Sequence, residues 1–256
     1  PWVGDAHAAA RLVAASEATG SSAQFLAGIE IRPAPGWHTY WRSPGDAGMA
    51  PRVDWHGSQN LARAALAWPA PRRFSVQGFD SAGYDGDVVL PVTVTLARPG
   101  RPATLHAALD YAVCAALCVP YHAELALAVP QGSARPGPQA PLIARFAARV
   151  PKPAAAAHVV VDGIGVDGGR GLWVRLRSTG AKFVAPDLFV EGAGDASFGR
   201  PQVTLAADGR SALFRVPVSD ARPADLVGHA LVLTLVDGPR AAEIAARPCR
   251  VAPPSL

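Results

Sequence analysis

The sequence predicts an all-β protein built from two immunoglobulin-like β-sandwich domains, and three observations favour that class. Glycine and proline number 25 each, far more than a helical bundle would carry. They recur at short intervals between runs in which apolar and polar residues alternate, the periodicity of a half-buried strand. With 256 residues, 50% of them hydrophobic, the chain is long enough to bury the cores of two domains.

The first domain is predicted over residues 1–135. Residues 23–33 alternate regularly, so that one face of the strand carries Phe25, Ala27, Ile29 and Ile31. Residues 36–43 continue in the same style, and residues 87–97 form a run rich in β-branched side chains. We expect these strands to supply the core of the first sandwich.

A Pro/Ala-rich connector is predicted over residues 136–156, with a short helix near 141–149. From residue 157 to residue 256 the alternating pattern resumes between turn residues. This part is predicted to be a second immunoglobulin-like sandwich of roughly seven strands.

A hairpin is predicted between residues 104–113 and 119–128, with Cys114 opposite Cys118 and residues 115–117 as the loop. In this register one face receives only apolar or aromatic pairs: Val113 with Val119, Tyr111 with Tyr121, Leu109 with Ala123, Ala107 with Leu125, and Leu105 with Leu127. A slip of one residue would mix the two faces, so the register is well specified. The cysteines fall on the other face, away from the core.

Opposed residues of an antiparallel pair lie about 4.5–5.5 Å apart, within the range of a disulfide. One interpretation of Cys114 and Cys118 is a structural staple. Such a short loop would bring stabilisation only towards the low end of the usual ~2–4 kcal/mol. The other interpretation is a redox-active pair, open to a thiolate from another protein.

Three further residues are candidates for the cysteine face. Asp110 and His122 should oppose each other two rungs from the sulfurs, as a surface ion pair or as a pair that tunes thiol acidity. Tyr40 is predicted to line the cysteine site, because Trp37 and Trp41 should take the core-facing side of the same strand.

Metal and cofactor chemistry receives little support from the sequence. His38, His56 and Met49, together with the cysteines, would make a soft copper site, but their spacing is irregular. We therefore expect no metal and no cofactor, and keep a copper-handling domain only as an alternative. Cys249 is expected to be a lone buried or half-buried thiol.

Charge and hydropathy exclude two other classes. The 24 Lys and Arg residues are interleaved with 20 Asp and Glu residues along the chain. A nucleic-acid-binding protein would gather its cations on one face or in one tract. No apolar run is long enough to span a bilayer, which takes about 18 residues or more.

The sequence resembles the periplasmic N-terminal region of the ScsB family (suppressor of copper sensitivity protein B) and, more distantly, the N-terminal domain of the thiol:disulfide interchange protein DsbD. The segments that carry the resemblance are GWHTYWRSPGDAG (36–48), WPAPRRF (68–74), GFDSAGYDGDVVLPV (78–92), YAVCAALCVP (111–120), DLFVEG (187–192) and LVLTLVDGP (231–239). Together they span most of residues 20–250.

The resemblance implies a thiol:disulfide oxidoreductase of the protein-disulfide reductase type, with Cys114 and Cys118 as its catalytic pair. Cys118 would form the mixed disulfide with a partner. A cap segment matched by residues 83–86, with Tyr84 and Asp85, would shield the cysteines. DsbD-like domains separate their cysteines more widely than this chain does.

The resemblance also implies a place in a larger system. The chain would be the periplasmic N-terminal region of an inner-membrane protein, with its transmembrane portion elsewhere in that protein. Electrons would come from a membrane-embedded domain through a thioredoxin-like C-terminal domain of the same protein. They would pass to periplasmic thioredoxin-like isomerase or reductase partners. A periplasmic binding module with a structural disulfide stays open as the non-enzymatic alternative.

Overall fold

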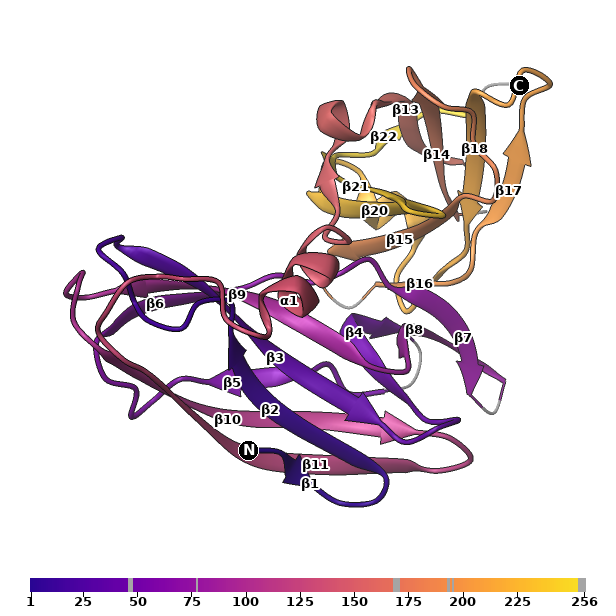
Figure 1. Cartoon of the computed structure of the whole chain (residues 1–256). Helices are drawn as coiled ribbons and strands as arrows, with labels where there is room; N and C mark the ends of the chain where they lie inside the picture. The colour runs from indigo at the N-terminus through magenta and orange to yellow at the C-terminus, as the bar shows by residue number, and fades with distance from the viewer. Residues whose placement is uncertain (46–47, 77, 168–170, 193, 195, 253–256) are drawn as a thin grey trace. The chain divides into compact units, whose positions relative to one another are not determined.

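The computed structural model describes residues 1–45, 48–76, 78–167, 171–192, 194 and 196–252, and most of them lie in β-strands (Figure 1). The chain divides into two compact units, Pro1–Val150 and Pro151–Leu256. The predicted all-β class with two sandwich units is confirmed. Among the described residues, no helix has the length and apolar character that a bilayer crossing requires.

The first unit is built from two sheets. The first sheet has the strand order β1 (Val3–Gly4), β2 (Ala8–Ala14), β3 (Gln24–Pro33), β9 (Val88–Leu96) and β6 (Leu61–Leu66). The second has the order β11 (Cys118–Val129), β10 (Ala103–Cys114), β4 (His38–Gly45), β8 (Phe79–Asp85) and β7 (Arg72–Val76), with β5 (Arg52–Asp54) also pairing with β10. Strand β4 therefore lies next to the cysteine hairpin, and β8 lies beyond β4, although both strands are distant from the hairpin in sequence.

The core of the first unit lies between the inner faces of these sheets. On β3 the predicted inward face is confirmed, since Phe25, Ala27, Ile29 and Ile31 are all buried. The second sheet contributes buried side chains that include Trp41, Leu105, Leu109 and Tyr111. Side chains of alternate residues point away from this core, and those of β4, β8 and β10 form the surface that carries the cysteines.

The described part contains a single α-helix, α1 (Ala140–Ala147). It begins one residue earlier than the predicted helix and ends two residues earlier. It covers the outer face of the first sheet, where the buried Ile143 packs over Gly28 and Val89. This stretch of the expected connector therefore packs onto the first unit. The boundaries at 135 and 156 stay a prediction.

The cysteine hairpin has the register predicted from the sequence, from Ala103 opposite Val129 to Cys114 opposite Cys118. The core-facing residues of β10 are fully buried, whereas much of β11 is exposed at the edge of the sheet. The register is this well defined because every pair on the buried face is apolar.

The second unit is also a β-sandwich. One sheet has the order β12 (Lys152–Pro153), β21 (Arg240–Ala246), β20 (Leu231–Asp237) and β15 (Asp187–Gly192). The other has the order β17 (Gln202–Leu205), β18 (Ser211–Val216), β14 (Gly171–Ser178), β13 (Val159–Asp167) and β22 (Cys249–Arg250). A small pair, β16 (Ser197–Phe198) with β19 (Val218–Ser219), and two short 3-10 helices, η1 (Ala154–Ala157) and η2 (Pro223–Leu226), complete it.

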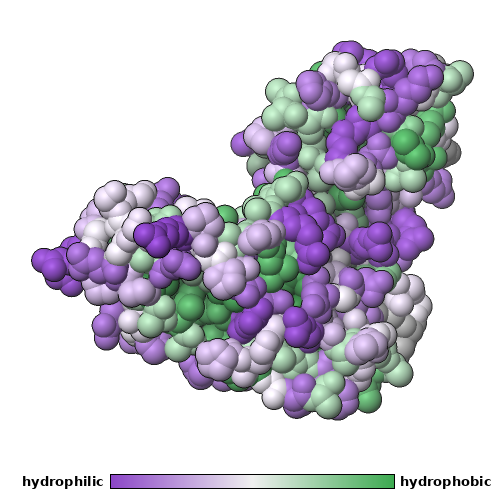
Figure 2. Space-filling view, in the orientation of Figure 1, coloured by the Kyte–Doolittle hydropathy of each residue, from purple (hydrophilic) through white to green (hydrophobic). Residues whose placement is uncertain are grey.

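This second unit has a hydrophobic core of its own, formed by both of its sheets and including Leu176, Phe214 and Leu233. On the face seen in Figure 2, hydrophilic residues are spread over each unit rather than gathered in one tract.

Candidate functional site

A disulfide joins Cys114, the last residue of β10, to Cys118, the first residue of β11. Their Cα atoms are 4.1 Å apart, close to the spacing expected for an opposed pair. The two cysteines differ in environment, because Cys114 is 0% exposed whereas Cys118 is exposed. A nucleophile from solvent therefore reaches the sulfur of Cys118 more readily than that of Cys114.

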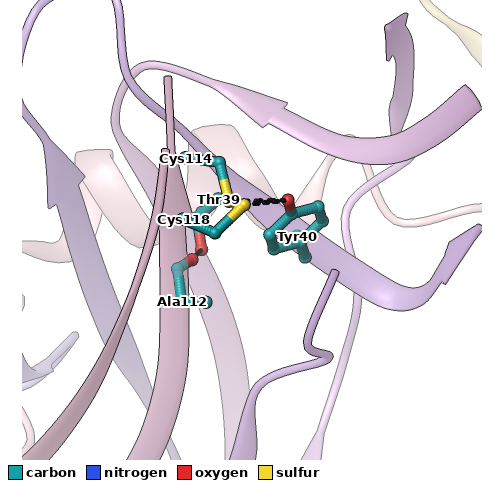
Figure 3. Close-up of a disulfide and its surroundings, with 5 residues drawn as sticks. All are labelled: Thr39, Tyr40, Ala112, Cys114 and Cys118. Atoms are coloured by element: carbon teal, nitrogen blue, oxygen red, sulfur yellow. Dashed lines mark hydrogen bonds between the residues drawn. A yellow bond between two sulfur atoms is a disulfide. The ribbon is translucent and has the colours of Figure 1, made fainter. Parts of the chain in front are cut away.

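Tyr40 on β4 reaches both sulfurs, as predicted from the alternation of its strand (Figure 3). Its hydroxyl lies 2.7 Å from Cys114 Sγ and 3.3 Å from Cys118 Sγ. The strand is held against β10 by Thr39, whose hydroxyl donates to the Ala112 carbonyl at 2.8 Å. Burial raises the pKa of Tyr40, so its hydroxyl stays protonated at neutral pH and is available as a donor.

Two half-buried apolar side chains cover the small cluster of Tyr40, Ala112 and Cys114. They are Met49, which follows β4, and Phe74 on β7. Gly48 lies directly on the Tyr40 ring, where a Cβ atom would stand only 2.3 Å from a ring carbon. Only a glycine allows the chain to approach the ring this closely, and its φ of +135° also favours glycine.

His38 lies beside the buried sulfur, because it pairs directly with Cys114 across β4 and β10. Its ring packs against Phe74 with centroids 4.0 Å apart, and edge-on against Tyr40 at 6.0 Å. Burial lowers the pKa of His38, and the negative charge of Asp85, its partner on β8, opposes that shift. His38 is therefore a largely shielded and neutral imidazole on the cysteine face.

The structure separates the two residues expected in the cap. Asp85 pairs with His38 and lies at the rim of the cysteine face. Tyr84 pairs with Thr39, so its side chain lies on the same face as Thr39 and on the opposite face from Tyr40. The buried hydroxyl of Tyr84 donates to the Pro69 carbonyl at 2.9 Å. The prediction that Tyr84 shields the sulfurs is corrected on this ground, since a strand places neighbouring side chains on opposite faces.

Asp110 and His122 face each other on the exposed surface of the hairpin, as the register predicts. Asp110 Oδ1 is 2.7 Å from His122 Nδ1, and the other ring nitrogen is 2.9 Å from Glu124 Oε1. The hydrogen bond with Asp110, followed by that with Glu124, raises the pKa of His122. A role of this pair in thiol acidity stays a prediction.

A hollow of about 520 Å³ adjoins the site. Its lining includes Met49 of the covering pair and Pro120, two residues beyond the exposed Cys118. Arg52, Asp110 and His122 supply charged or titratable groups around the same hollow. The surface next to Cys118 is therefore concave and partly apolar.

Three other expectations concern residues around or beyond the site. Trp41 is fully buried as expected, but Trp37 is only half-buried, with its ring 4.8 Å from that of His7. The expectation that Cys249 is buried or half-buried is wrong. It is an exposed free thiol on the short strand β22, with Sγ 3.3 Å from the Ile164 carbonyl oxygen.

The expected absence of a metal stays a prediction, and so does the copper-handling alternative. Within the described ranges, no three His, Cys, Asp or Glu side chains gather as a metal site would require. Of the candidate soft ligands, Met49 packs against the cluster that contains Cys114, whereas His56 is exposed in the turn after β5.

The sequence did not single out Phe74 as a residue of the site, and it grouped Met49 and His38 with the cysteines only in the copper-site alternative. Alternation along residues 36–43 puts His38 and Tyr40 on one face, and that signal was available for His38. Phe74 reaches the site only because β7 and β8 lie next to β4 in the sheet. No local pattern of the sequence reports that strand order.

Comparisons with known proteins match two regions of the chain to family models. Residues 9–130 match the family model described as thiol:disulfide interchange protein DsbD, N-terminal. Residues 149–249 match a domain of unknown function. A search of curated proteins found no match.

Among solved structures, the crystal structure of the N-terminal periplasmic domain of ScsB from Proteus mirabilis is similar. It has a TM-score of 0.75 and 24% sequence identity, and the match covers 98% of each chain. The reduced N-terminal domain of DsbD from Neisseria meningitidis matches 50% of this chain and 90% of its own, at 18% identity. Its TM-score of 0.27 is too low to inform the fold. The resemblance predicted from the sequence is confirmed.

Proposed function

We propose that the first unit carries out thiol–disulfide exchange through a reversible Cys114–Cys118 pair. The observation that carries the proposal is the asymmetric disulfide at the hairpin tip, with one buried and one exposed cysteine. It lies within the region that matches the DsbD N-terminal family. A purely structural staple would not need a tyrosine hydroxyl on both sulfurs or a cover of two half-buried side chains.

The reaction follows from the difference in exposure. In the reduced state Cys118 attacks a disulfide of the partner, and the partner's first sulfur leaves as a thiolate. Cys114 then attacks Cys118 Sγ, which re-forms the intramolecular disulfide and releases the partner's second sulfur. Two electrons pass from the pair to the partner. The Tyr40 hydroxyl donates to Cys114 Sγ and would stabilise thiolate charge on Cys114 whenever that sulfur is the leaving group.

Partners and location belong to the same proposal. The likeness to a periplasmic ScsB domain supports a periplasmic location. In this proposal electrons arrive from a membrane-embedded domain by way of a thioredoxin-like domain. The recipients would be periplasmic thioredoxin-like proteins. The hollow beside Cys118, partly apolar and edged by Asp110 and His122, offers them a docking surface.

A redox titration tests the proposal. The full chain is equilibrated in glutathione buffers of graded potential, the free thiols are alkylated, and the modified species are counted. We expect Cys114 and Cys118 to be oxidised together at a potential above about −300 mV, the range of labile rather than structural disulfides. A pair that stays oxidised below that potential would establish the structural staple instead.

Variants of each cysteine complete the test. Cys114→Ser should accumulate a mixed disulfide through Cys118, because the resolving thiol is missing. Cys118→Ser should transfer no electrons to a protein disulfide. Cys249→Ser is the matched control, because this exposed thiol lies in the second unit and should leave transfer unchanged.

A further inference from the structure

The buried position of Cys114 raises a question about its proton. In the proposed reaction this thiol must become a thiolate before it attacks Cys118, yet its side chain is 0% exposed. Burial in apolar surroundings disfavours the thiolate. A proton acceptor within the protein would remove that barrier, and it must lie on the face that carries the sulfur.

His38 lies on that face. It is directly opposite Cys114 on the neighbouring strand, so the two side chains share a face and their Cβ atoms lie about 4.5–5.5 Å apart. The Nε2 atom of His38 is buried and has no hydrogen-bond partner among the described residues. A buried polar atom of this kind normally has a partner, so its lack of one calls for an explanation.

We propose that His38 accepts the proton of the Cys114 thiol when Cys114 resolves the mixed disulfide, an inference that rests on the proposed function. The Cys114 S–H bond breaks and its proton moves to His38 Nε2. The Cys114 Sγ–Cys118 Sγ bond forms, the bond from Cys118 to the partner sulfur breaks, and its electron pair leaves on the partner as a thiolate. When the pair is reduced again, His38 returns the proton to Cys114.

The neighbours of His38 suit this role. Tyr40, on the same strand, is a donor rather than a base, because burial raises its pKa. Asp85 faces His38 from β8, and its negative charge would stabilise the imidazolium that proton transfer creates. Phe74 covers the ring from β7 without adding a charge. The desolvated ring is neutral at neutral pH, so its basic form is already present.

The test separates the first attack from resolution. The reduced full chain, carrying Cys249→Ser to remove the exposed thiol, is mixed with the chromogenic disulfide dithiobis-nitrobenzoate. Attack by Cys118 releases one coloured thiolate at a rate that depends on reagent concentration. Resolution by Cys114 releases the second coloured thiolate in an intramolecular step, whose rate does not depend on reagent concentration. At high reagent concentration the first release is fast, and resolution is observed as the slow phase.

We expect His38→Gln to leave the first release unchanged and to slow the second by about 10²-fold, the lower end of what a positioned base contributes. The slow phase of the parent chain should rise with pH and level off once His38 is neutral, whereas the variant should keep rising. His106→Gln, an exposed histidine on the same strand as Cys114, should match the parent. An unchanged slow phase and pH profile in His38→Gln would overturn the inference.

Two further outcomes are decisive. If the parent chain never releases the second thiolate, the proposed function fails, and the role of His38 fails with it. If His38→Gln does not fold, the Cys118→Ser chain provides the measurement. In that chain the ultraviolet absorbance of the Cys114 thiolate and the nuclear magnetic resonances of the His38 ring should change over the same pH range. A thiolate that forms without a response from His38 would contradict proton transfer.

Discussion

At the residue scale, the reactivity of the disulfide depends on the atoms that surround Cys114 Sγ. The Tyr40 hydroxyl lies 2.7 Å from that sulfur, and Ala112 and Phe74 supply apolar surroundings. In such surroundings a hydrogen bond to a developing thiolate is stronger than one made in water. Single side-chain changes here should therefore alter rates more than they alter stability.

Tyr40→Phe is predicted to slow reduction of the disulfide. Without the hydroxyl, the Cys114 thiolate loses a charge-assisted hydrogen bond of about 1.5 kcal/mol, which corresponds to about tenfold in rate. The measurement is the rate of reduction by dithiothreitol at fixed pH, alongside the free energy of unfolding. Stability should fall by only about 1 kcal/mol, since sulfur is a weak acceptor.

Tyr111→Phe is the matched control for that variant. Tyr111 is equally buried and lies on the opposite face of β10, and its hydroxyl has no partner among the described residues. Removing an unsatisfied buried hydroxyl should leave stability unchanged or raise it, and the rate of reduction should not change. Equal slowing in both variants would contradict a specific role of the Tyr40 hydroxyl.

At the scale of elements, the site forms where three strands distant in sequence meet one hairpin. β10 and β11 present the sulfurs, β4 brings Tyr40 and His38, β8 brings Asp85, and β7 brings Phe74. The hairpin could be predicted in full because its pairing is local and its buried face is uniformly apolar. The contributions of β7 and β8 could not, because strand order in a sheet depends on tertiary packing.

The same reasoning explains the error at Tyr84. The resemblance marks residues 83–86 as the cap, but it does not say which face of β8 each residue takes. Pairing with β4 puts Gly83 and Asp85 on the cysteine face and Tyr84 on the other. The Phe74 ring, on the neighbouring strand β7, lies over Gly83, where a Cβ atom would stand 3.0 Å from it. Phe74, rather than Tyr84, therefore provides the cover.

Phe74→Ala is predicted to speed reduction of the disulfide several-fold. The ring covers the cluster that holds Cys114, so its loss should open the sulfurs to small thiols. The measurement is the rate of reduction by glutathione under conditions in which the chain stays folded. Phe198→Ala, which truncates another half-buried phenylalanine in the second unit, should not change that rate. A slower or unchanged rate in Phe74→Ala would show that Phe74 does not shield the pair.

The exposed face of the hairpin gives a prediction about pH. The pKa of His122 is raised above 6.5, mainly by its hydrogen bond with Asp110 and then by that with Glu124. A group whose pKa is higher in the folded state than in the unfolded state stabilises the folded state at pH values below its unfolded-state pKa. That contribution is lost as the pH rises through its folded-state pKa. Asp110→Asn should therefore lower the pKa of His122, measured by nuclear magnetic resonance of its ring.

Glu124→Gln should lower the same pKa by a smaller amount, because Glu124 is the weaker of the two causes. An unchanged pKa in Asp110→Asn would contradict the observed pairing. Since all three side chains are exposed, we expect their effect on the thiols to be modest.

At the scale of the whole molecule, the residues that surround the disulfide belong to one unit. His38, Tyr40, Met49, Phe74 and Cys118 all precede Val150, where the first unit ends. The second unit has a core of its own, and Cys249, its free thiol, is exposed. Composition and alternation predict two sandwiches because each sheet must bury one face, whereas no sequence pattern assigns a task to the second unit.

This division predicts that the redox chemistry is a property of residues 1–150 alone. Each unit buries an apolar core of its own, so the fragments 1–150 and 151–256 should each unfold in one cooperative transition. Because the residues that surround the sulfurs, Tyr40, Met49 and Phe74, belong to the first unit, fragment 1–150 should have the same midpoint potential as the full chain. The measurement is the glutathione titration applied to both. A shifted potential in a cooperatively folded fragment would mean that the second unit tunes the pair, which would give that unit a direct part in electron transfer.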